Sequence, residues 1–157
     1  MNKRVAIIRI AGQTKLNKQV KYTFSILRLY KKNTCVIIKN TPSKLGMIKK
    51  LKDFITWGEL DEKTFKILLE KRGRIIGNKP LTNNYIQEKS KLNLNDFINE
   101  FMECKKELKD VPGLKQFFRL SPPRKGFEKK GTKHPFSLGG SLGYRKEKIN
   151  ELIQRMI

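Results

Sequence analysis

The 157-residue sequence has little of what most enzymes and secreted proteins depend on: one histidine, two cysteines and one tryptophan. Cys35 and Cys104 are far apart and no C-x-x-C pair is present, which excludes a disulfide framework and a zinc site. We expect both to be small buried side chains in a reducing compartment. His134 has no neighbouring nucleophile or acid to complete a catalytic set, so we interpret it as a contact to a phosphate or a base.

Long hydrophobic runs are also missing. No apolar segment approaches the roughly 20 residues of a transmembrane helix, so the sequence predicts no membrane partner. The opening segment, MNKRVAIIRIAG, has basic residues before a short apolar run, but Arg9 interrupts the run and it is too short for a secretory signal. We interpret the segment as a strand.

Acidic residues are scarce, with 14 Asp and Glu against 36 Lys and Arg and a formal net charge of +22. Such an excess attracts a strongly negative partner, so nucleic acid is the favoured ligand. A metal-dependent nuclease needs clustered carboxylates, and the nearest group, Glu59, Asp61 and Glu62, is explained by capping at a helix start. We therefore predict no enzymatic activity, metal, cofactor or small-molecule substrate.

Hydrophobic patterning predicts the order β-α-β-α-β over residues 1–60. Runs of β-branched residues predict strands at 5–10, 34–39 and 54–57. Apolar residues at helical spacing predict amphipathic helices from Leu16 to about Asn33 and over residues 43–53. This part is expected to be a compact α/β sandwich with a modest core.

Residues 61–157 are predicted to form a mostly helical extension. Asp61 is placed to cap a helix that ends just before Gly73. Asn95 is placed to cap a second helix, which Pro112 and the following glycine stop. Residues 74–94 show no clear pattern. A short strand at 115–120 and a last helix from Tyr144 complete the extension; the apolar positions of that helix are Ile149, Leu152, Ile153 and Met156.

The most unusual stretch is residues 119–145, RLSPPRKGFEKKGTKHPFSLGGSLGYR. It holds three of the six prolines, five of the eleven glycines, seven Lys or Arg and one acid, Glu128. Such a composition predicts a loop, and a loop of this length is functional or disordered. Because glycines let backbone N–H groups approach phosphates and the basic residues supply charge, we predict that it threads along RNA and is mobile without RNA.

The predicted RNA contacts fall into two sets. In the loop, the cations expected to neutralise phosphates are Arg119, Arg124, Lys125, Lys129, Lys130, Lys133 and Arg145. His134 and Phe127 are expected to touch bases or sugars, although docking on the protein body explains Phe127 and Phe136 equally well. The second set is Lys44, Lys49 and Lys50, which, like the basic residues from Lys15 to Lys32, have no nearby acid to pair with. The glycines at 139–143 lack the P-loop pattern and are interpreted as a backbone that follows RNA or as a plain turn.

Three segments together resemble a known family: VAIIRIAG, TCVIIKNTPSKLGMIKKLKDFITWGEL and FRLSPPRKGFEKKGTKHPFSLGGSLGYR. The chain is similar to the universal L-thirty family of large-subunit ribosomal proteins, the L-seven group of eukaryotes. The resemblance covers nearly the whole chain and is to the archaeal type, which has the C-terminal half that bacterial members lack and no long basic N-terminal extension. One departure is Arg124-Lys125-Gly126, where many relatives have an arginine and two glycines.

The resemblance implies an α+β protein whose core is a ferredoxin-like sandwich of two helices on a three-stranded antiparallel sheet. It implies a non-catalytic structural component of the large (50S) ribosomal subunit in the cytoplasm. The implied partners are large-subunit (23S-type) rRNA, close to the 5S rRNA region, and neighbouring ribosomal proteins. From the residues alone two other classes stay open, a small DNA-compacting protein and an RNA-processing nuclease.

Overall fold

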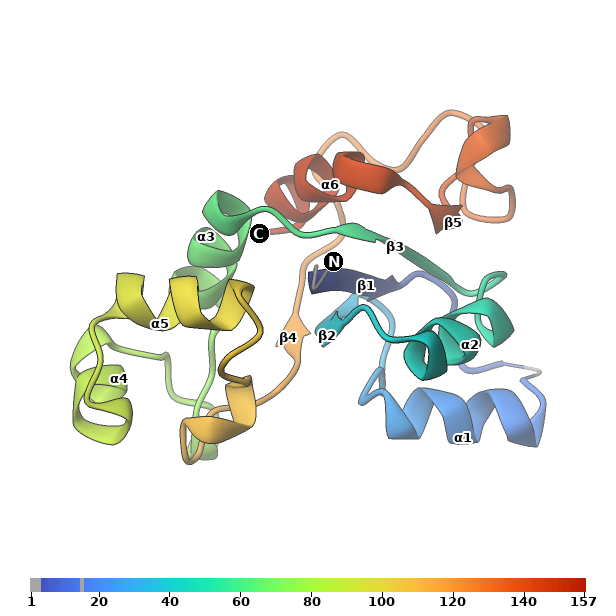
Figure 1. Ribbon diagram of the computed structural model, residues 1–157. Coiled ribbons are helices and arrows are strands. Elements are labelled where there is room, and N and C mark those ends of the chain that lie inside the picture. Colours follow the sequence, from blue (N-terminus) through green and yellow to red (C-terminus); the bar gives the residue numbers. More distant parts are fainter. Residues whose placement is uncertain (1–3, 15) are drawn as a thin grey trace.

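A mostly antiparallel sheet lies at the centre of the molecule, whose computed structural model describes residues 4–14 and 16–157. Strand β1 (Arg4–Arg9) runs between β2 (Thr34–Lys39) and β3 (Ile55–Glu59), as Figure 1 shows. Two short strands lie at the edges: β4 (Phe118–Arg119) is antiparallel to β2, and β5 (Gly143–Tyr144) is parallel to β3. The three-stranded sheet that we expected is thus five-stranded among the described residues, because the second half of the chain adds both outer strands.

Two helices cover one face of the sheet, α1 (Lys18–Ile26) and α2 (Pro42–Lys50) (Figure 1). They bury Val5 and Ile7 of β1 together with apolar residues of their own. Helix α1 is shorter than predicted: it ends at Ile26 because Arg28 takes a positive φ of 58°, which an α-helix does not accommodate. Lys15, which we expected near the start of this helix, lies outside the described residues.

The opposite face carries the helices of the second half, α3 (Glu62–Arg72), α5 (Leu94–Met102) and α6 (Ile149–Met156). Because side chains alternate along a strand, Ala6 and Ile8 of β1 point into this second core. Phe65 of α3 and Phe101 of α5 stack there with ring centroids 4.4 Å apart. All four apolar positions predicted for the last helix are buried. The two halves of the chain therefore share one sheet.

The unassigned stretch contains α4 (Asn83–Ser90), which packs on α5, and a 3-10 turn, Ile76–Asn78. Other 3-10 turns are Leu108–Asp110, Phe136–Leu138 and Lys146–Lys148. Tyr144 belongs to β5, so the last helix begins five residues later than predicted, at Ile149. The predicted strand at 115–120 is confined to the two residues of β4.

Two predicted capping residues need correction. The N-cap of α5 is Asn93, and Asn95 lies inside the helix. Gly73 does follow α3, but its φ is −60° and not left-handed. A glycine is needed there for a different reason, since a Cβ would lie 2.3 Å from the carbonyl oxygen of Leu69.

Cys35 and Cys104 are both buried, as predicted. Trp57 is only partly buried and packs against the core beneath α1 and α2. Across the residues that the structure describes, no helix has the length and apolar character needed to cross a membrane.

Candidate nucleic-acid interface

The loop of residues 119–145 has internal structure of its own. The amide of Phe136 donates to the carbonyl of Leu142 at 2.7 Å, and the amide of Leu142 donates to the carbonyl of His134 at 3.1 Å. Gly140 lies so close to this turn that a Cβ would be 2.1 Å from the carbonyl oxygen of His134. The glycine group 139–143 thus closes a tight turn, as one of the two interpretations predicted.

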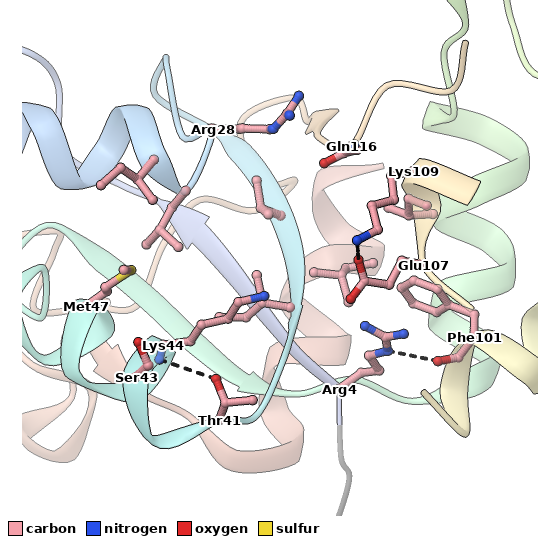
Figure 2. A pocket seen from close by; sticks show the side chains of 16 residues that line it. Arg4, Arg28, Thr41, Ser43, Lys44, Met47, Phe101, Glu107, Lys109 and Gln116 are labelled. Carbon is pink, nitrogen blue, oxygen red and sulfur yellow. Dashed lines mark hydrogen bonds and ion pairs between the residues drawn. The ribbon is translucent and has the colours of Figure 1, made fainter. Parts of the chain in front are cut away.

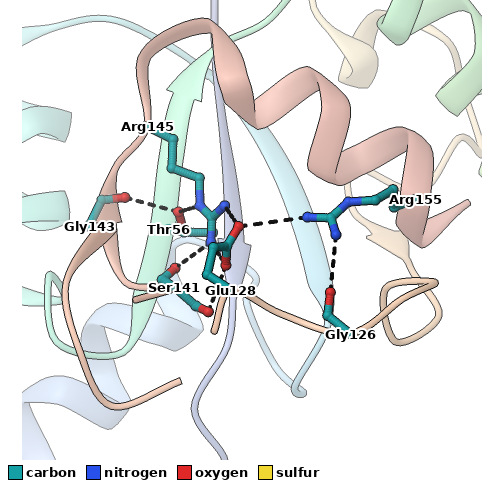
Figure 3. Close-up of polar contacts among 7 residues, drawn as sticks. All are labelled: Thr56, Gly126, Glu128, Ser141, Gly143, Arg145 and Arg155. Atoms are coloured by element: carbon teal, nitrogen blue, oxygen red, sulfur yellow. Dashed lines mark hydrogen bonds and ion pairs between the residues drawn. The ribbon is translucent and has the colours of Figure 1, made fainter. Parts of the chain in front are cut away.

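Glu128, the single acid of the loop, faces inward and anchors it to the body (Figure 3). Its carboxylate accepts hydrogen bonds from both terminal nitrogens of Arg145, one of them 2.7 Å long, and from the hydroxyl of Ser141 at 2.8 Å. Arg155 of α6 approaches the same carboxylate at 3.6 Å. The loop's only negative charge is therefore neutralised inside the protein.

Arg145 itself is buried, with 3% of its surface exposed. Its Nε donates to the hydroxyl of Thr56 on β3 at 2.8 Å, and a terminal nitrogen donates to the carbonyl of Ser141 at 2.9 Å. We expected Arg145 to neutralise a phosphate, and this placement contradicts that role, because its donors already face protein acceptors. The physical reason is the partly buried carboxylate of Glu128, which needs a cation beside it.

The pKa of Glu128 predicts a pH dependence. Burial of the carboxylate raises its pKa, but hydrogen bonds from Arg145 and Ser141 outweigh that effect and leave the pKa at about 2. Because this is below the roughly 4.3 of an unfolded glutamate, ionised Glu128 stabilises the fold fully above about pH 5 and loses this effect as the pH falls through 2.

We therefore expect the free energy of unfolding of wild type to exceed that of Glu128→Gln by about 2 kcal/mol at pH 7. The difference is modest because 20% of the Glu128 side chain is exposed. Urea unfolding of both proteins between pH 2 and 7 measures the difference, which should shrink steadily below pH 5. A difference that does not vary with pH would show that the carboxylate charge is not what stabilises the loop.

Most of the other predicted loop contacts lie on the surface. The exposed set consists of Arg119, Arg124, Lys125, Lys129, Lys130, Lys133 and His134. Phe127 is partly buried and packs against the core that holds α3, α5 and α6, which favours docking over base stacking. Phe136 lies beneath the guanidinium of Arg145, whose central carbon is 4.7 Å from the ring centroid. With Glu128 turned inward, the outer surface of the loop carries charge of one sign only.

Lys125, which stands where many relatives have a glycine, has a backbone conformation that is unusual for lysine. Its φ is 64° and that of Gly126 is 74°, so both residues are left-handed. Glycine adopts this region readily and lysine only at some expense, which is consistent with a pair of glycines at this turn in many relatives. In this chain an exposed lysine takes up this left-handed conformation.

The second predicted set lies on α2. Lys49 and Lys50 are exposed in its last turn. Lys44 is partly buried and lines a pocket of about 280 Å³ beside β2. Figure 2 shows Lys44 on one wall of this pocket, with Lys109 and Glu107 on the other. The ammonium of Lys109 contacts the Glu107 carboxylate at 3.0 Å, so the one acid among the lining residues is already paired.

Of the three acids that we assigned to a helix start, Asp61 and Glu62 do lie there, and Glu59 has a different role. Glu59 is the last residue of β3, and its carboxylate accepts a hydrogen bond from the hydroxyl of Tyr144 on β5. This bond raises the pKa of Tyr144 to about 12. Asp61 is the N-cap residue of α3 but makes no side-chain capping bond, and Glu62 lies in the first turn. Glu59 therefore joins two strands.

Sequence reasoning missed the buried arginines of β1. Arg4 donates to the carbonyl of Phe101 at 2.8 Å on one face of the sheet, and Arg9 donates to the carbonyl of Leu29 at 2.7 Å on the other. Burial lowers the pKa of each guanidinium. The signal that could have identified them is an arginine at each end of a strand whose other residues are apolar. We had interpreted Arg9 only as an interruption of a hydrophobic run.

Comparisons with known proteins identify the family to which the chain is similar. Residues 5–55 match the family described as Ribosomal protein L30p/L7e. The chain is 49% identical to large ribosomal subunit protein uL30 of Nanoarchaeum equitans, with 97% of each chain covered. It is 45% identical to the uL30 protein of Methanosphaera stadtmanae over 97% of this chain and 99% of the relative, and 44% identical to that of Methanopyrus kandleri over 93% and 99%.

These relatives match the second half of the chain, including the 119–145 loop, as well as the sheet and its first two helices. Identities above 40% across more than nine-tenths of both chains go well beyond a shared fold. The chain therefore belongs to the uL30 family of large-subunit ribosomal proteins.

Proposed function

We propose that the protein is a structural constituent of the large ribosomal subunit, where it binds and stabilises large-subunit rRNA. The observation that carries this proposal is the charge arrangement of residues 119–145, in which exposed cations cover a loop whose only acid is partly buried and paired with Arg145. A surface with one sign of charge favours a phosphate backbone over a protein partner. The relatives are named as large ribosomal subunit proteins, which supports the same function.

The proposed contact surface has two parts. The loop contributes Arg119, Arg124, Lys125, Lys129, Lys130, Lys133 and His134, and α2 contributes Lys44, Lys49 and Lys50. Contacts from lysine and arginine to phosphates fix the position of the protein on RNA without reading bases. Recognition would depend on the shape and backbone of folded rRNA, including the region near 5S rRNA. Arg145 and Phe127 are left out, because the protein interior accounts for them.

The function itself is tested on purified ribosomal subunits. We expect mass spectrometry to find one copy of this chain on each large subunit after a high-salt wash. Loss in the wash, with recovery on DNA or in a free pool, would contradict the proposal and favour the DNA-compacting or RNA-processing alternatives. Cross-linking of this chain to a neighbouring ribosomal protein on the intact subunit would identify its protein partners.

The role of the loop is tested by replacing Arg124, Lys125, Lys129, Lys130 and Lys133 with glutamine. We expect the affinity for large-subunit rRNA to fall roughly 10²- to 10³-fold at 0.15 M salt, because each phosphate contact releases counterions. The slope of log affinity against log salt should decrease by about 3 to 4. Fluorescence anisotropy over a salt series measures both quantities.

A matched control removes five exposed lysines from α3 and the α4 region: Lys63, Lys66, Lys71, Lys89 and Lys91. It has the same net charge as the loop variant. We expect it to keep most of the wild-type affinity, and an equal loss in the two variants would show that net charge alone drives binding. Equal affinity of wild type for duplex DNA and for rRNA would favour the DNA-compacting alternative.

A further inference from the structure

A small basic pocket lies beside β4. Its volume is about 120 Å³, enough for a group the size of a few water molecules. The residues that line it are Arg72, Arg74, Asn78, Lys115, Phe117 and Arg119. Four of the six are cations and none is an acid. Only Arg119 belongs to the contacts predicted from the sequence.

The backbone brings these cations together from separate stretches of chain. After α3 ends at Arg72, residues 74–80 form a small hairpin in which Arg74 pairs with Pro80. The amide of Lys115 donates to the carbonyl of Arg74 at 2.9 Å, so the two side chains start from adjacent positions. Arg119 comes from β4, opposite Thr34 of β2. The pocket therefore forms where the hairpin after α3 meets the segment that leads into β4.

The cations of this pocket have few partners of their own. Within residues 4–14 and 16–157, no ion pair involves any of the four. Arg74 makes one long hydrogen bond, 3.4 Å to the carbonyl of Gly73, and Lys115 donates to the side-chain oxygen of Asn78 at 3.2 Å. Arg72 differs, because the hydroxyl of Ser121 and the carbonyl of Ile157 hold it at 2.6 and 2.7 Å.

Arg9 and Arg145 show how arginines with a purely structural role are held in this fold. Arg9 donates to four backbone carbonyls, and Arg145 is paired with the carboxylate of Glu128. Arg74 and Arg119 have no comparable acceptors among the described residues, yet both line a confined space. Like charges held together repel one another, and a bound anion removes that repulsion.

We infer that this pocket binds a single phosphate group, and that in the ribosome the phosphate belongs to the rRNA backbone. Arginine suits this ligand because its planar guanidinium makes paired hydrogen bonds to phosphate oxygens. The ring of Phe117 forms an apolar wall that limits water and strengthens these contacts. The assignment to rRNA rests on the proposed function, whereas the phosphate site itself does not.

Inorganic phosphate is the first probe, added to the full-length protein at constant ionic strength with chloride as the reference salt. We expect the Nε–Hε NMR signals of Arg74 and Arg119 to shift and saturate, and those of Arg124 to shift weakly without saturation. The Nε–Hε signal of Arg72, which also lines the pocket, should saturate in wild type but not in Arg74→Gln/Arg119→Gln, which lacks the other two arginine signals. Arg72 is left unchanged because it also holds Ser121 and Ile157. Uniform, unsaturated shifts at every arginine would overturn the site.

The second measurement is rRNA affinity over a salt series. The Arg74→Gln/Arg119→Gln variant should bind at least tenfold more weakly at 0.15 M salt, with a salt slope smaller by about 1 to 2. A variant with Arg74→Lys/Arg119→Lys keeps the charge and checks folding; it should recover only part of the affinity, because lysine makes no paired bonds.

The outcomes separate the two proposals. Saturable phosphate binding with unchanged rRNA affinity in the glutamine variant would overturn the assignment to rRNA and indicate a site for free phosphate. Failure of the wild-type protein to bind rRNA would contradict the proposed function, while the phosphate titration would still decide the pocket. Lys63→Gln/Lys71→Gln, with two exposed cations removed from α3, is the matched control and should change neither measurement.

Discussion

Arg9→Met is expected to lower the free energy of unfolding by about 3 to 5 kcal/mol, the largest effect of any single substitution that we predict. Arg9 is 2% exposed, and its guanidinium donates to the carbonyls of Ala11, Gly12, Leu29 and Tyr30 at 2.7 to 3.2 Å. Methionine preserves much of the volume but leaves these carbonyls without a donor. The segments that follow β1 and α1 would then lose the group that joins them.

The ring of Phe24 adds to this effect, because the central carbon of the Arg9 guanidinium lies 3.9 Å from its centroid. Urea unfolding followed by circular dichroism measures the loss. Arg124→Met is the control, since Arg124 is exposed and should change stability by no more than about 0.5 kcal/mol. Arg9→Lys should fall between the two because one ammonium cannot reach all the carbonyls. An Arg9→Met protein as stable as wild type would show that these hydrogen bonds are not essential to the fold.

Arg145→Met is expected to lower the free energy of unfolding by about 3 to 4 kcal/mol. It removes the partner of a largely buried carboxylate, as well as the bonds to Thr56 and Ser141. Breaking one side of such a pair is more harmful than removing both sides, since an uncompensated charge is left behind. The double variant Glu128→Gln/Arg145→Met should therefore be more stable than Arg145→Met alone.

A double-mutant cycle of these variants measures the coupling energy between Glu128 and Arg145. Additive effects in the cycle would rule out a direct interaction in solution. Hydrogen exchange on the same proteins reports on the loop. In Arg145→Met we expect faster exchange at the amides of Gly131, Phe136 and Leu142, whose hydrogen bonds lie within the loop.

Hydrogen exchange on the wild-type protein tests whether the loop is mobile without RNA, as its glycine, proline and charge content predicts. That expectation stays a prediction. Strong protection of residues 124–143 without RNA would contradict it and show that Glu128 and Arg145 order the loop before it meets rRNA. Rapid exchange would instead mean that the contacts made by Glu128 persist only when RNA holds the loop in place.

Local patterns predicted much of the framework. The β-branched runs located the three central strands, and helical spacing located α2, α3 and the buried face of α6. These signals are local, because the period of apolar residues reports directly on the face that a strand or helix buries. Helix ends were less predictable, as Ile26 and Asn93 show, since a positive φ or a capping residue depends on what the chain meets next.

Among the candidate site residues, the sequence located the basic loop and the lysines of α2 but not the roles of individual side chains. Arg124 and Arg145 look alike in a sequence of this composition. One is exposed and the other is buried beside Glu128, and only the position of β5 against β3 separates them. Likewise, the basic pocket needs Arg74 and Lys115 to be adjacent, although they are about forty residues apart in the chain.

The sequence by itself determined the charge of this protein, its partner class, its family resemblance and the order of its central elements, because all of these follow from composition, motifs and short-range periodicity. Tertiary structure alone decided the outer strands of the sheet, the burial of Arg4, Arg9 and Arg145, and the convergence of four cations beside β4. The physical reason is that a charged side chain takes its role from the acceptors around it, and those acceptors come from distant parts of the chain.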